Sequence, residues 1–218
     1  LVYLCEEDAF IMGVKKNKDI RLQVPGGETT VLLHTCCAPC SSAIIEAMMK
    51  EGITPVIYYC NPNIYPLEEY EIRKNECTRY ARSLGLEIVD ADYDHENWLD
   101  AVKGLEGEPE RGGRCLRCFK IRLLRTARYA AQRGIRVITT TLASSRWKSL
   151  DQINEAGRWA CEEVSRQYNM TPPDEIVIWW DQNWRKNGLQ ERRLQILKEY
   201  DFYNQLYCGC EFSMRKDA

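Results

Sequence analysis

The stretch VLLHTCCAPCSSAIIEAMMK, residues 31–50, places an apolar run, a group of cysteines and a helical pattern directly after one another. The run at 31–34 has the length and composition of a short buried strand. Residues 41–51 follow with the pattern of a helix, and Pro39 suits its first turn, where no backbone N–H donor is needed. The stretch therefore predicts a strand–helix unit with three cysteines in its connecting turn.

Working outward, apolar runs of strand length continue to alternate with longer helical segments. Further strands are expected at residues 54–60, 86–90, 136–140 and 175–180, and helices at 67–84, 96–103, 115–133, 150–168 and 190–200. This alternation indicates an α/β fold, with a parallel sheet and flanking helices. Such sheets bind ligands beyond the carboxyl ends of their strands. We therefore expect the cysteine turn and the loops after the other strands to meet at one edge.

Composition narrows the class of protein without naming it. The 218 residues include 30 basic and 32 acidic side chains, so the net charge of −2 does not by itself demand a nucleic-acid partner. No run is long and apolar enough to span a membrane, and residues 1–30 lack the cationic start and apolar core of a signal peptide. We expect a cytoplasmic protein with an N-terminal extension of unknown role, residues 1–30, and a single α/β metalloenzyme domain, residues 31–218.

Eleven cysteines are many for a chain without a secretory signal, and clustered cysteines in such a chain indicate metal or redox chemistry. Four stand alone and are expected to be packing residues or inert thiols: Cys5, Cys60, Cys77 and Cys161. The other seven form three groups: Cys36, Cys37 and Cys40; Cys115 and Cys118; and Cys208 and Cys210.

The spacing of the cysteines limits what each group can do. Two cysteines separated by two residues can reach one metal, and the adjacent pair Cys36–Cys37 can do so only where the chain turns. Two thiolates from each of the first two groups would supply the four ligands of an iron–sulfur cube or of a structural zinc. Cys208-Gly-Cys210 is too tight for a relaxed disulfide and suits a redox relay, a second metal or two unconnected thiols.

Other residues allow both a functional and a structural interpretation. His34 ends a strand and either orients a ligand or is a satisfied core histidine. Asp92 lies in a loop after a strand. Its carboxylate could bind a metal or act as a proton donor, or the residue forms a turn.

The basic and aromatic groups also have two interpretations. Arg146 and Lys148 suit a phosphate or a solvated surface. Trp179, Trp180 and Trp184 suit base stacking or packing, and Arg117, Lys120, Arg125 and Arg128 form a basic helix face that suits an RNA backbone or solvent.

Six stretches together resemble one family, the epoxyqueuosine reductases of the QueH type. They are LLHTCCAPCS (32–41), YYCNPNIYPLEEYEIRK (58–74), DADYD (90–94), RCLRCFKIRL (114–123), TTTLASSRWKSLDQINEAG (139–157) and YCGCEFS (207–213). Their order and number make the resemblance specific, and they extend over nearly the whole chain beyond the N-terminal extension.

The resemblance implies an adenine-nucleotide-hydrolase-like (HUP) three-layer sandwich. It implies a [4Fe-4S] cluster on Cys36, Cys37, Cys115 and Cys118, redox-active Cys208 and Cys210 nearby, and an additional iron, to whose region we assign Asp92. It further implies reduction of epoxyqueuosine to queuosine at the tRNA wobble position, without cobalamin, with electrons from an unidentified donor.

Two rivals remain open. An iron–sulfur-dependent tRNA thiolation enzyme of the same broad fold would carry a glycine-rich pyrophosphate loop after the first strand, where this chain has CCAPCS (36–41). A zinc-stabilised binding protein without turnover would use the same thiols, and its colourless metal would distinguish it from an iron–sulfur protein.

Overall fold

The computed structural model describes residues 21–170 and 176–214 of the chain. The described strands form a five-stranded sheet in the order β3-β2-β1-β4-β5, in which every neighbouring pair is parallel. Their bounds are Thr30–Thr35 (β1), Thr54–Tyr59 (β2), Ile88–Asp90 (β3), Val137–Thr140 (β4) and Ile178–Trp179 (β5). The chain moves outward from β1 to β3 and then adds β4 and β5 on the other side, so the strand order reverses between β1 and β4.

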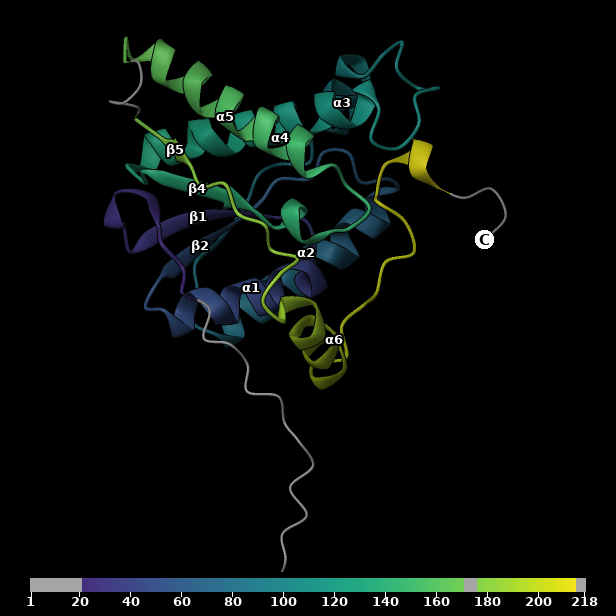
Figure 1. The fold of residues 1–218 in the computed structure, drawn as a ribbon. Coiled ribbons are helices and arrows are strands. Elements are labelled where there is room, and N and C mark those ends of the chain that lie inside the picture. Colours follow the sequence, from purple (N-terminus) through teal and green to yellow (C-terminus); the bar gives the residue numbers. More distant parts are fainter. Residues whose placement is uncertain (1–20, 171–175, 215–218) are drawn as a thin grey trace, which may run out of the picture.

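Helices cover both faces of this sheet, as Figure 1 shows. The helices are α1 (Ala38–Lys50), α2 (Leu67–Ser83), α3 (His95–Ala101), α4 (Gly113–Arg133), α5 (Leu150–Gln167) and α6 (Leu189–Glu199). α1, α2 and α6 lie on one side, and α4 packs with α5 on the other. Three short 3-10 helices complete the described elements: η1 (Pro25–Gly27), η2 (Thr141–Ser144) and η3 (Glu211–Ser213). The predicted three-layer α/β fold with a parallel sheet is confirmed.

The core lies around the central strand. Val31, Leu32 and Leu33 of β1 have no exposed surface, as expected of a strand covered by helices on both faces. The apolar face predicted for α4 is also confirmed, because Phe119 and Leu123 pack into the same core. Cys60, Cys77 and Cys161 are buried in this core as the sequence predicted, whereas Cys5 lies outside the described residues.

Element boundaries follow the sequence prediction to within a few residues. Two differences are larger. β5 covers only Ile178–Trp179 of the expected strand at 175–180, whose first residue lies outside the described part, and α1 begins at Ala38 rather than at residue 41. Cys37 precedes it in an extended conformation and Pro39 occupies its first turn, so the helix starts inside the cysteine motif. This places Cys40 on α1 itself.

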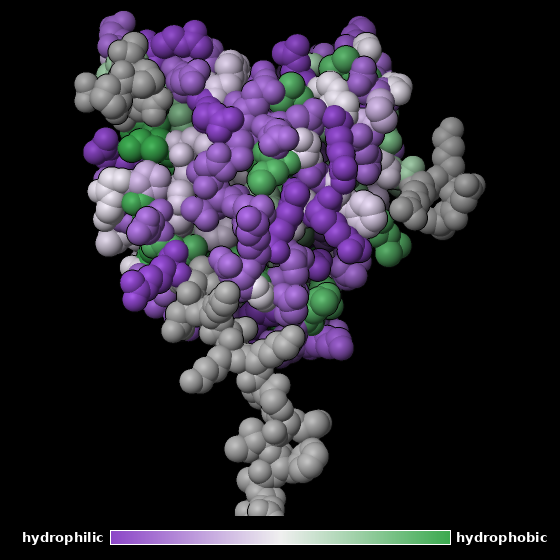
Figure 2. All heavy atoms as spheres, viewed as in Figure 1, coloured by the Kyte–Doolittle hydropathy of each residue, from purple (hydrophilic) through white to green (hydrophobic). Residues whose placement is uncertain are grey.

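The segment after α6 connects the two helical layers. In Figure 1 the yellow chain leaves α6 on one side of the sheet and runs to η3 beside the end of the layer that holds α3 and α4. This segment carries Cys208 and Cys210. Cys210 packs with Cys118 near the start of α4, and Cys208 and Cys210 line one cavity with Cys115. Figure 2 shows a largely hydrophilic surface with scattered hydrophobic side chains on the same face. None of the described helices is long and apolar enough to cross a membrane.

Candidate metal centre

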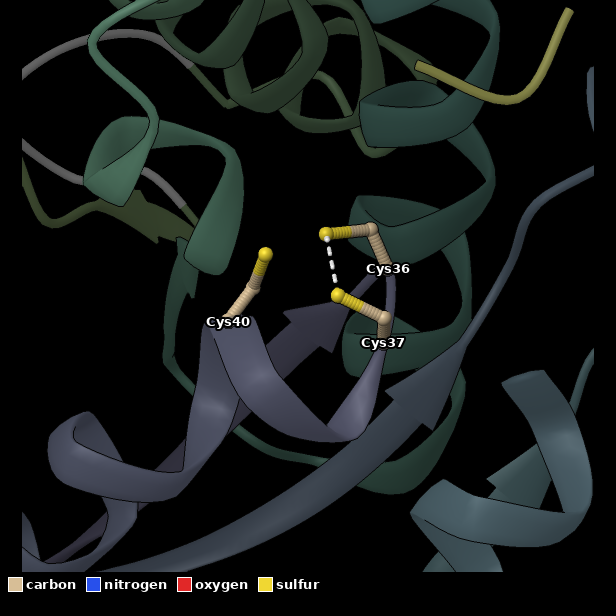
Figure 3. A group of neighbouring side chains, drawn as sticks. All are labelled: Cys36, Cys37 and Cys40. Carbon is tan, nitrogen blue, oxygen red and sulfur yellow. Dashed lines mark hydrogen bonds between the residues drawn. The ribbon is translucent and has the colours of Figure 1, made fainter. Parts of the chain in front are cut away.

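The first group of thiols lies where β1 passes into α1. Cys36 and Cys37 come from the turn, and Cys40 comes from the first turn of α1 (Figure 3). Their three sulfur atoms lie within 4.8 Å of one another, and the Sγ atoms of Cys36 and Cys37 are 3.9 Å apart. Because Cys37 precedes the helix in an extended conformation, the backbone supplies the turn that lets adjacent cysteines face one space. The sequence motifs by themselves assign no role to Cys40.

A threonine that follows the neighbouring strand lies against this group. The hydroxyl of Thr141, which follows β4, accepts a hydrogen bond from the backbone N–H of Cys36 at 3.3 Å and is 3.5 Å from its sulfur. The thiols therefore sit between the ends of β1 and β4, where the strand order reverses. This is the ligand-binding position expected of an open parallel sheet.

The second and third groups meet at the start of α4. Cys115 and Cys118 lie in its first turns, and Cys118 packs with Cys210, Trp98 and Val102 in a small apolar cluster. The backbone N–H of Arg111 donates to the sulfur of Cys115 at 3.3 Å. Cys115 and Cys118 are not part of the close trio around Cys36, so their sharing of one cluster with Cys36 and Cys37 stays a prediction.

The Cys-Gly-Cys segment is held in place by buried polar contacts. Arg73 of α2, which is paired with Glu69 at 2.6 Å, donates to the backbone carbonyls of Cys208 and Tyr207 at 3.3 Å each. The carbonyl of Gly209 accepts from the backbone N–H of Tyr65 at 2.9 Å. Sequence reasoning missed Arg73, because a basic residue in a charged helix has no pattern that distinguishes a buried clamp from a solvated side chain.

Both the backbone conformation at residue 209 and the atoms packed around it favour glycine at this position. Its φ of 128° lies in a region that residues with a side chain rarely adopt. A Cβ there would lie 3.0 Å from Cγ1 of Ile64, 3.2 Å from Nη1 of Arg73 and 3.3 Å from Nδ2 of Asn63. The glycine thus lets the segment approach α2 closely enough for Arg73 to reach it.

Two cations lie among the thiols without a carboxylate partner among the described residues. The guanidinium of Arg122 is buried and donates to the carbonyl of Cys60 at 3.2 Å, to the sulfur of Cys118 at 4.0 Å and to the amide oxygen of Asn61. Burial opposes the charge of Lys148, yet Cys208, Cys36 and Cys40 raise its pKa above the usual lysine value. A buried cation needs anionic compensation, which thiolates can supply.

The thiols themselves have unequal acidity. Hydrogen bonding from Cys37 and Cys40 holds the pKa of Cys36 well below its usual range, against the effect of burial. Hydrogen bonding with Cys36 raises the pKa of Cys40 to about 11, and burial raises the pKa of Cys118 to about 11. Burial also raises the pKa of Cys115 and Cys210. Metal binding must therefore displace protons from most of these groups.

His34 is a satisfied core histidine. Its Nε2 donates to the carbonyl of Cys60 at 3.0 Å, so its Nδ1 accepts from the hydroxyl of Thr140 at 2.7 Å. Burial, helped by the charge of Arg122, lowers its pKa to about 3. Both ring nitrogens are occupied, so His34 orients the ends of β1 and β4 rather than binding a ligand.

The remaining sequence candidates divide between solvent and core. Asp92 is exposed in the loop after β3, and its backbone carbonyl accepts a hydrogen bond from Arg125 at 3.3 Å. The structure does not bring its carboxylate to the thiols, so its link to an iron stays a prediction. Trp179, Trp180 and Trp184 are buried, so their packing interpretation is the one that holds.

A cavity of about 760 Å³ opens onto the thiols, and its size lies in the range of pockets that hold small ligands. Its wall includes Cys40, Cys115, Cys208, Cys210 and Lys148. Cysteines from all three sequence groups therefore face one space. Gln205 lies beside the same space and donates to the sulfur of Cys37 at 3.2 Å, a contact for which the sequence offers no signal.

Comparison with known proteins identifies the family. A family model described as "Epoxyqueuosine reductase QueH" matches residues 31–216. The chain belongs to the QueH family. The relative from Haemophilus influenzae, named epoxyqueuosine reductase QueH, is 47% identical over 195 residues, which are 89% of this chain and 76% of the relative. The relative of the same name from Acinetobacter baylyi is 44% identical, with 90% of this chain and 85% of the relative covered.

A more distant QueH relative, from Thermotoga maritima, is 34% identical over 188 residues. The match covers 85% of this chain and 90% of that relative. The family match includes all seven clustered cysteines, so the resemblance inferred from the sequence motifs is confirmed at the level of the family.

Proposed function

We propose that this chain is an epoxyqueuosine reductase, an oxidoreductase that removes the epoxide oxygen of epoxyqueuosine at the tRNA wobble position to give queuosine. The observation that carries this proposal is the cavity at the strand reversal point, whose wall includes cysteines from three distant segments. The relatives named above support the substrate.

We assign a [4Fe-4S] cluster to Cys36, Cys37, Cys115 and Cys118. The donor set fits such a group, because soft thiolates select iron–sulfur clusters or zinc, and the site holds two cations that would balance the negative charge of thiolate ligands. Cys40 lies close enough to Cys36 and Cys37 to be a further ligand. Cys208 and Cys210 are then available for a second iron or for redox chemistry.

The reaction takes up two electrons and two protons per epoxide and releases one water. The cluster, once bound, supplies electrons singly from an external donor. The chain must therefore hold the nucleoside and deliver protons to the departing oxygen. Lys148 lines the cavity and Asp92 does not, so Lys148 is better placed to give a proton to the departing oxygen.

The test is an anaerobic assay of the iron-loaded protein on tRNA that contains epoxyqueuosine, with a strong reductant and no added cobalamin. Nucleoside mass spectrometry should show the loss of one oxygen atom from the modified base. An unchanged nucleoside would refute the proposal. A protein that stays colourless and holds zinc after anaerobic purification would favour a binding protein without turnover.

The role of Cys208 and Cys210 is tested separately. The double variant Cys208→Ser and Cys210→Ser should keep the visible absorption of the cluster, because the four cysteines assigned to the cluster remain. It should lose turnover, because the second redox pair or the ligands of a second iron are gone. Full turnover by this variant would show that the pair is not needed for the reaction.

A further inference from the structure

The wall of the cavity is strongly cationic although the chain as a whole is slightly acidic. Its basic residues are Arg111, Arg114, Arg146, Lys148, Arg185 and Arg193, against a single acidic residue, Glu110. In the described part of the chain none of these basic side chains forms a salt bridge. A cleft lined by one sign of charge concentrates ligands of the opposite sign.

Two of these arginines form hydrogen bonds that organise a loop at the mouth of the cavity. Arg111 donates from Nε to the carbonyl of Trp147 and from Nη2 to the carbonyl of Arg146, both at 2.9 Å. Arg185 donates from Nη2 to the carbonyl of Lys148 at 2.8 Å. The carbonyls of residues 146, 147 and 148 therefore all accept hydrogen bonds from arginines. This loop is organised before any ligand binds.

Neither Arg111 nor Arg185 has an anionic partner among the residues that the structure describes. Nε of Arg185 is buried and has no hydrogen-bond acceptor among the described residues. Burial and the nearby charge of Arg111 lower the pKa of Arg185, as expected where two cations face each other without a carboxylate. An anion at the mouth would relieve this repulsion.

Large apolar side chains are exposed at the same mouth. Trp147 is 63% exposed, Leu194 is 55% exposed and Leu206 is 82% exposed, and all three line the cavity. The guanidinium of Arg146 lies 5.0 Å from the centroid of the Trp147 ring. An exposed aromatic ring beside arginines is the combination that proteins use to stack unpaired bases and bind their phosphates.

We propose that this rim, formed by Arg111, Arg146, Trp147, Arg185 and Arg193, binds the anticodon loop of the substrate tRNA. Trp147 stacks a nucleobase beside the wobble position. Arg146 and Arg193, whose guanidinium groups form no hydrogen bond within the described part of the chain, bind phosphates. This inference rests on the proposed function, because it assumes that the modified nucleoside enters the cavity. An acidic electron-donor protein would also be attracted here, but an exposed tryptophan at an opening of nucleoside size favours RNA.

The test compares variants that change the rim without touching the thiols. Trp147→Ala, Arg193→Gln and the control Arg82→Gln, in the exposed last turn of α2, are loaded with iron under anaerobic conditions. Fluorescence anisotropy then measures their affinity for a labelled anticodon stem-loop that carries epoxyqueuosine. Trp147→Ala should weaken binding about tenfold or more, the usual loss of one stacked base. Arg193→Gln should weaken binding and reduce the slope of log K against log salt by about 0.7.

Arg82→Gln should bind as the wild type does, and iron content should be equal in all variants. Wild-type affinity in both rim variants would overturn the proposal, even if the wild-type protein reduces epoxyqueuosine. Weakened binding in the rim variants, with no loss of oxygen from the nucleoside in any protein, would refute the proposed function while the RNA site stands. The rim variants could also bind RNA normally and lose turnover only when a protein, rather than a chemical reductant, supplies the electrons. That result would assign the rim to the electron donor and overturn the proposal.

Discussion

His34 links the end of the central strand to the strand beside it, and its buried imidazole sets a pH dependence at the residue scale. Its pKa is about 3 in the folded protein against 6.5 for an ordinary histidine, because burial disfavours the charged ring. The unfolded chain therefore binds more protons between these values. The resulting stability is fully present above pH 6.5 and is lost as the pH falls toward 3.

His34→Gln should remove this dependence. Between about pH 7 and about pH 5, the wild-type free energy of unfolding should fall more steeply than that of the variant, by up to about 1.4 kcal/mol per pH unit. Urea denaturation of both proteins at several pH values measures the two slopes. Other acidic titrations, including those of the thiols, occur in both proteins, so equal slopes would contradict the prediction.

Gly209 gives a second prediction at this scale. Gly209→Ala should destabilise the fold by about 1–3 kcal/mol through backbone strain, and should also reduce epoxide reduction by moving Cys208 and Cys210 away from the cavity. Thermal unfolding and the tRNA assay measure the two effects.

The matched control is Gly104→Ala, because Gly104 has a φ of 83° but no atom within 4 Å of its added Cβ. It should show a comparable loss of stability from backbone strain without the loss of turnover. Equal turnover in the two variants would mean that the contacts of Gly209 with Ile64 and Arg73 do not position the thiols.

The sequence identifies the thiols at this scale, but not the residues that surround them. Clustered cysteines are rare enough to be recognised by spacing alone. Arg122 and Arg73 each belong to a charged helix, and nothing local distinguishes them from solvated arginines. They are buried because carbonyls that are distant in the sequence, those of Cys60 and Cys208 among them, lie beside them in the fold.

At the scale of elements, Gly157 allows α5 to pack closely against β5. A Cβ on Gly157 would lie 2.2 Å from Cδ2 of Trp179, whose indole N–H donates to Asn154 at 3.2 Å. The helix can pack this closely on the edge strand only because residue 157 has no side chain. β5 lies beside β4, which ends at the thiols.

Gly157→Ala should therefore destabilise the protein by about 1–3 kcal/mol, since the rigid ring and the helix must separate. Gly107→Ala, at a loop glycine with no atom within 4 Å of an added Cβ, is the control and should change stability by less than about 1 kcal/mol. Denaturant unfolding of the two variants measures the difference. A Gly157→Ala protein as stable as this control would show that the edge strand can shift without cost.

Most elements were predictable because their signals are local. The apolar run of β1 and the amphipathic face of α4 mark their own type and approximate ends. The earlier start of α1 at Ala38 was not predicted, because it depends on the extended conformation of Cys37 at the end of β1. That difference of three residues puts Cys40 on the helix and beside the other two sulfurs.

For the whole molecule, a bound metal centre should link the end of β1 to the start of α4 and so stabilise the fold. The proposed ligands come from the end of β1 and the start of α4, and the segment with Cys208 and Cys210 lies beside them. Iron loading should raise the unfolding temperature by about 5–10 °C, the shift expected for a ligand worth about 3 kcal/mol in a chain of this size.

Hydrogen exchange of loaded and metal-free protein locates the effect. Amides of residues 36–40, 113–118 and 206–210 should exchange more slowly after loading, whereas those in the middle of α5 should not change. Protection confined to residues 36–40 would show that the metal binds only the trio after β1 and would refute the shared ligand set.

The sequence by itself determined the alternation of strands and helices, the membership of the chain in its family and the seven thiols, because periodicity, motif order and cysteine spacing are properties of neighbouring residues. The tertiary structure alone decided that thiols from all three groups line one cavity, that Arg122 and Lys148 lie near these groups, and that Trp147 rather than the buried tryptophans is exposed at the cavity. These features depend on the reversal of strand order between β1 and β4 and on the path of the chain after α6. Both bring together residues that lie far apart along the chain, so no local pattern encodes them.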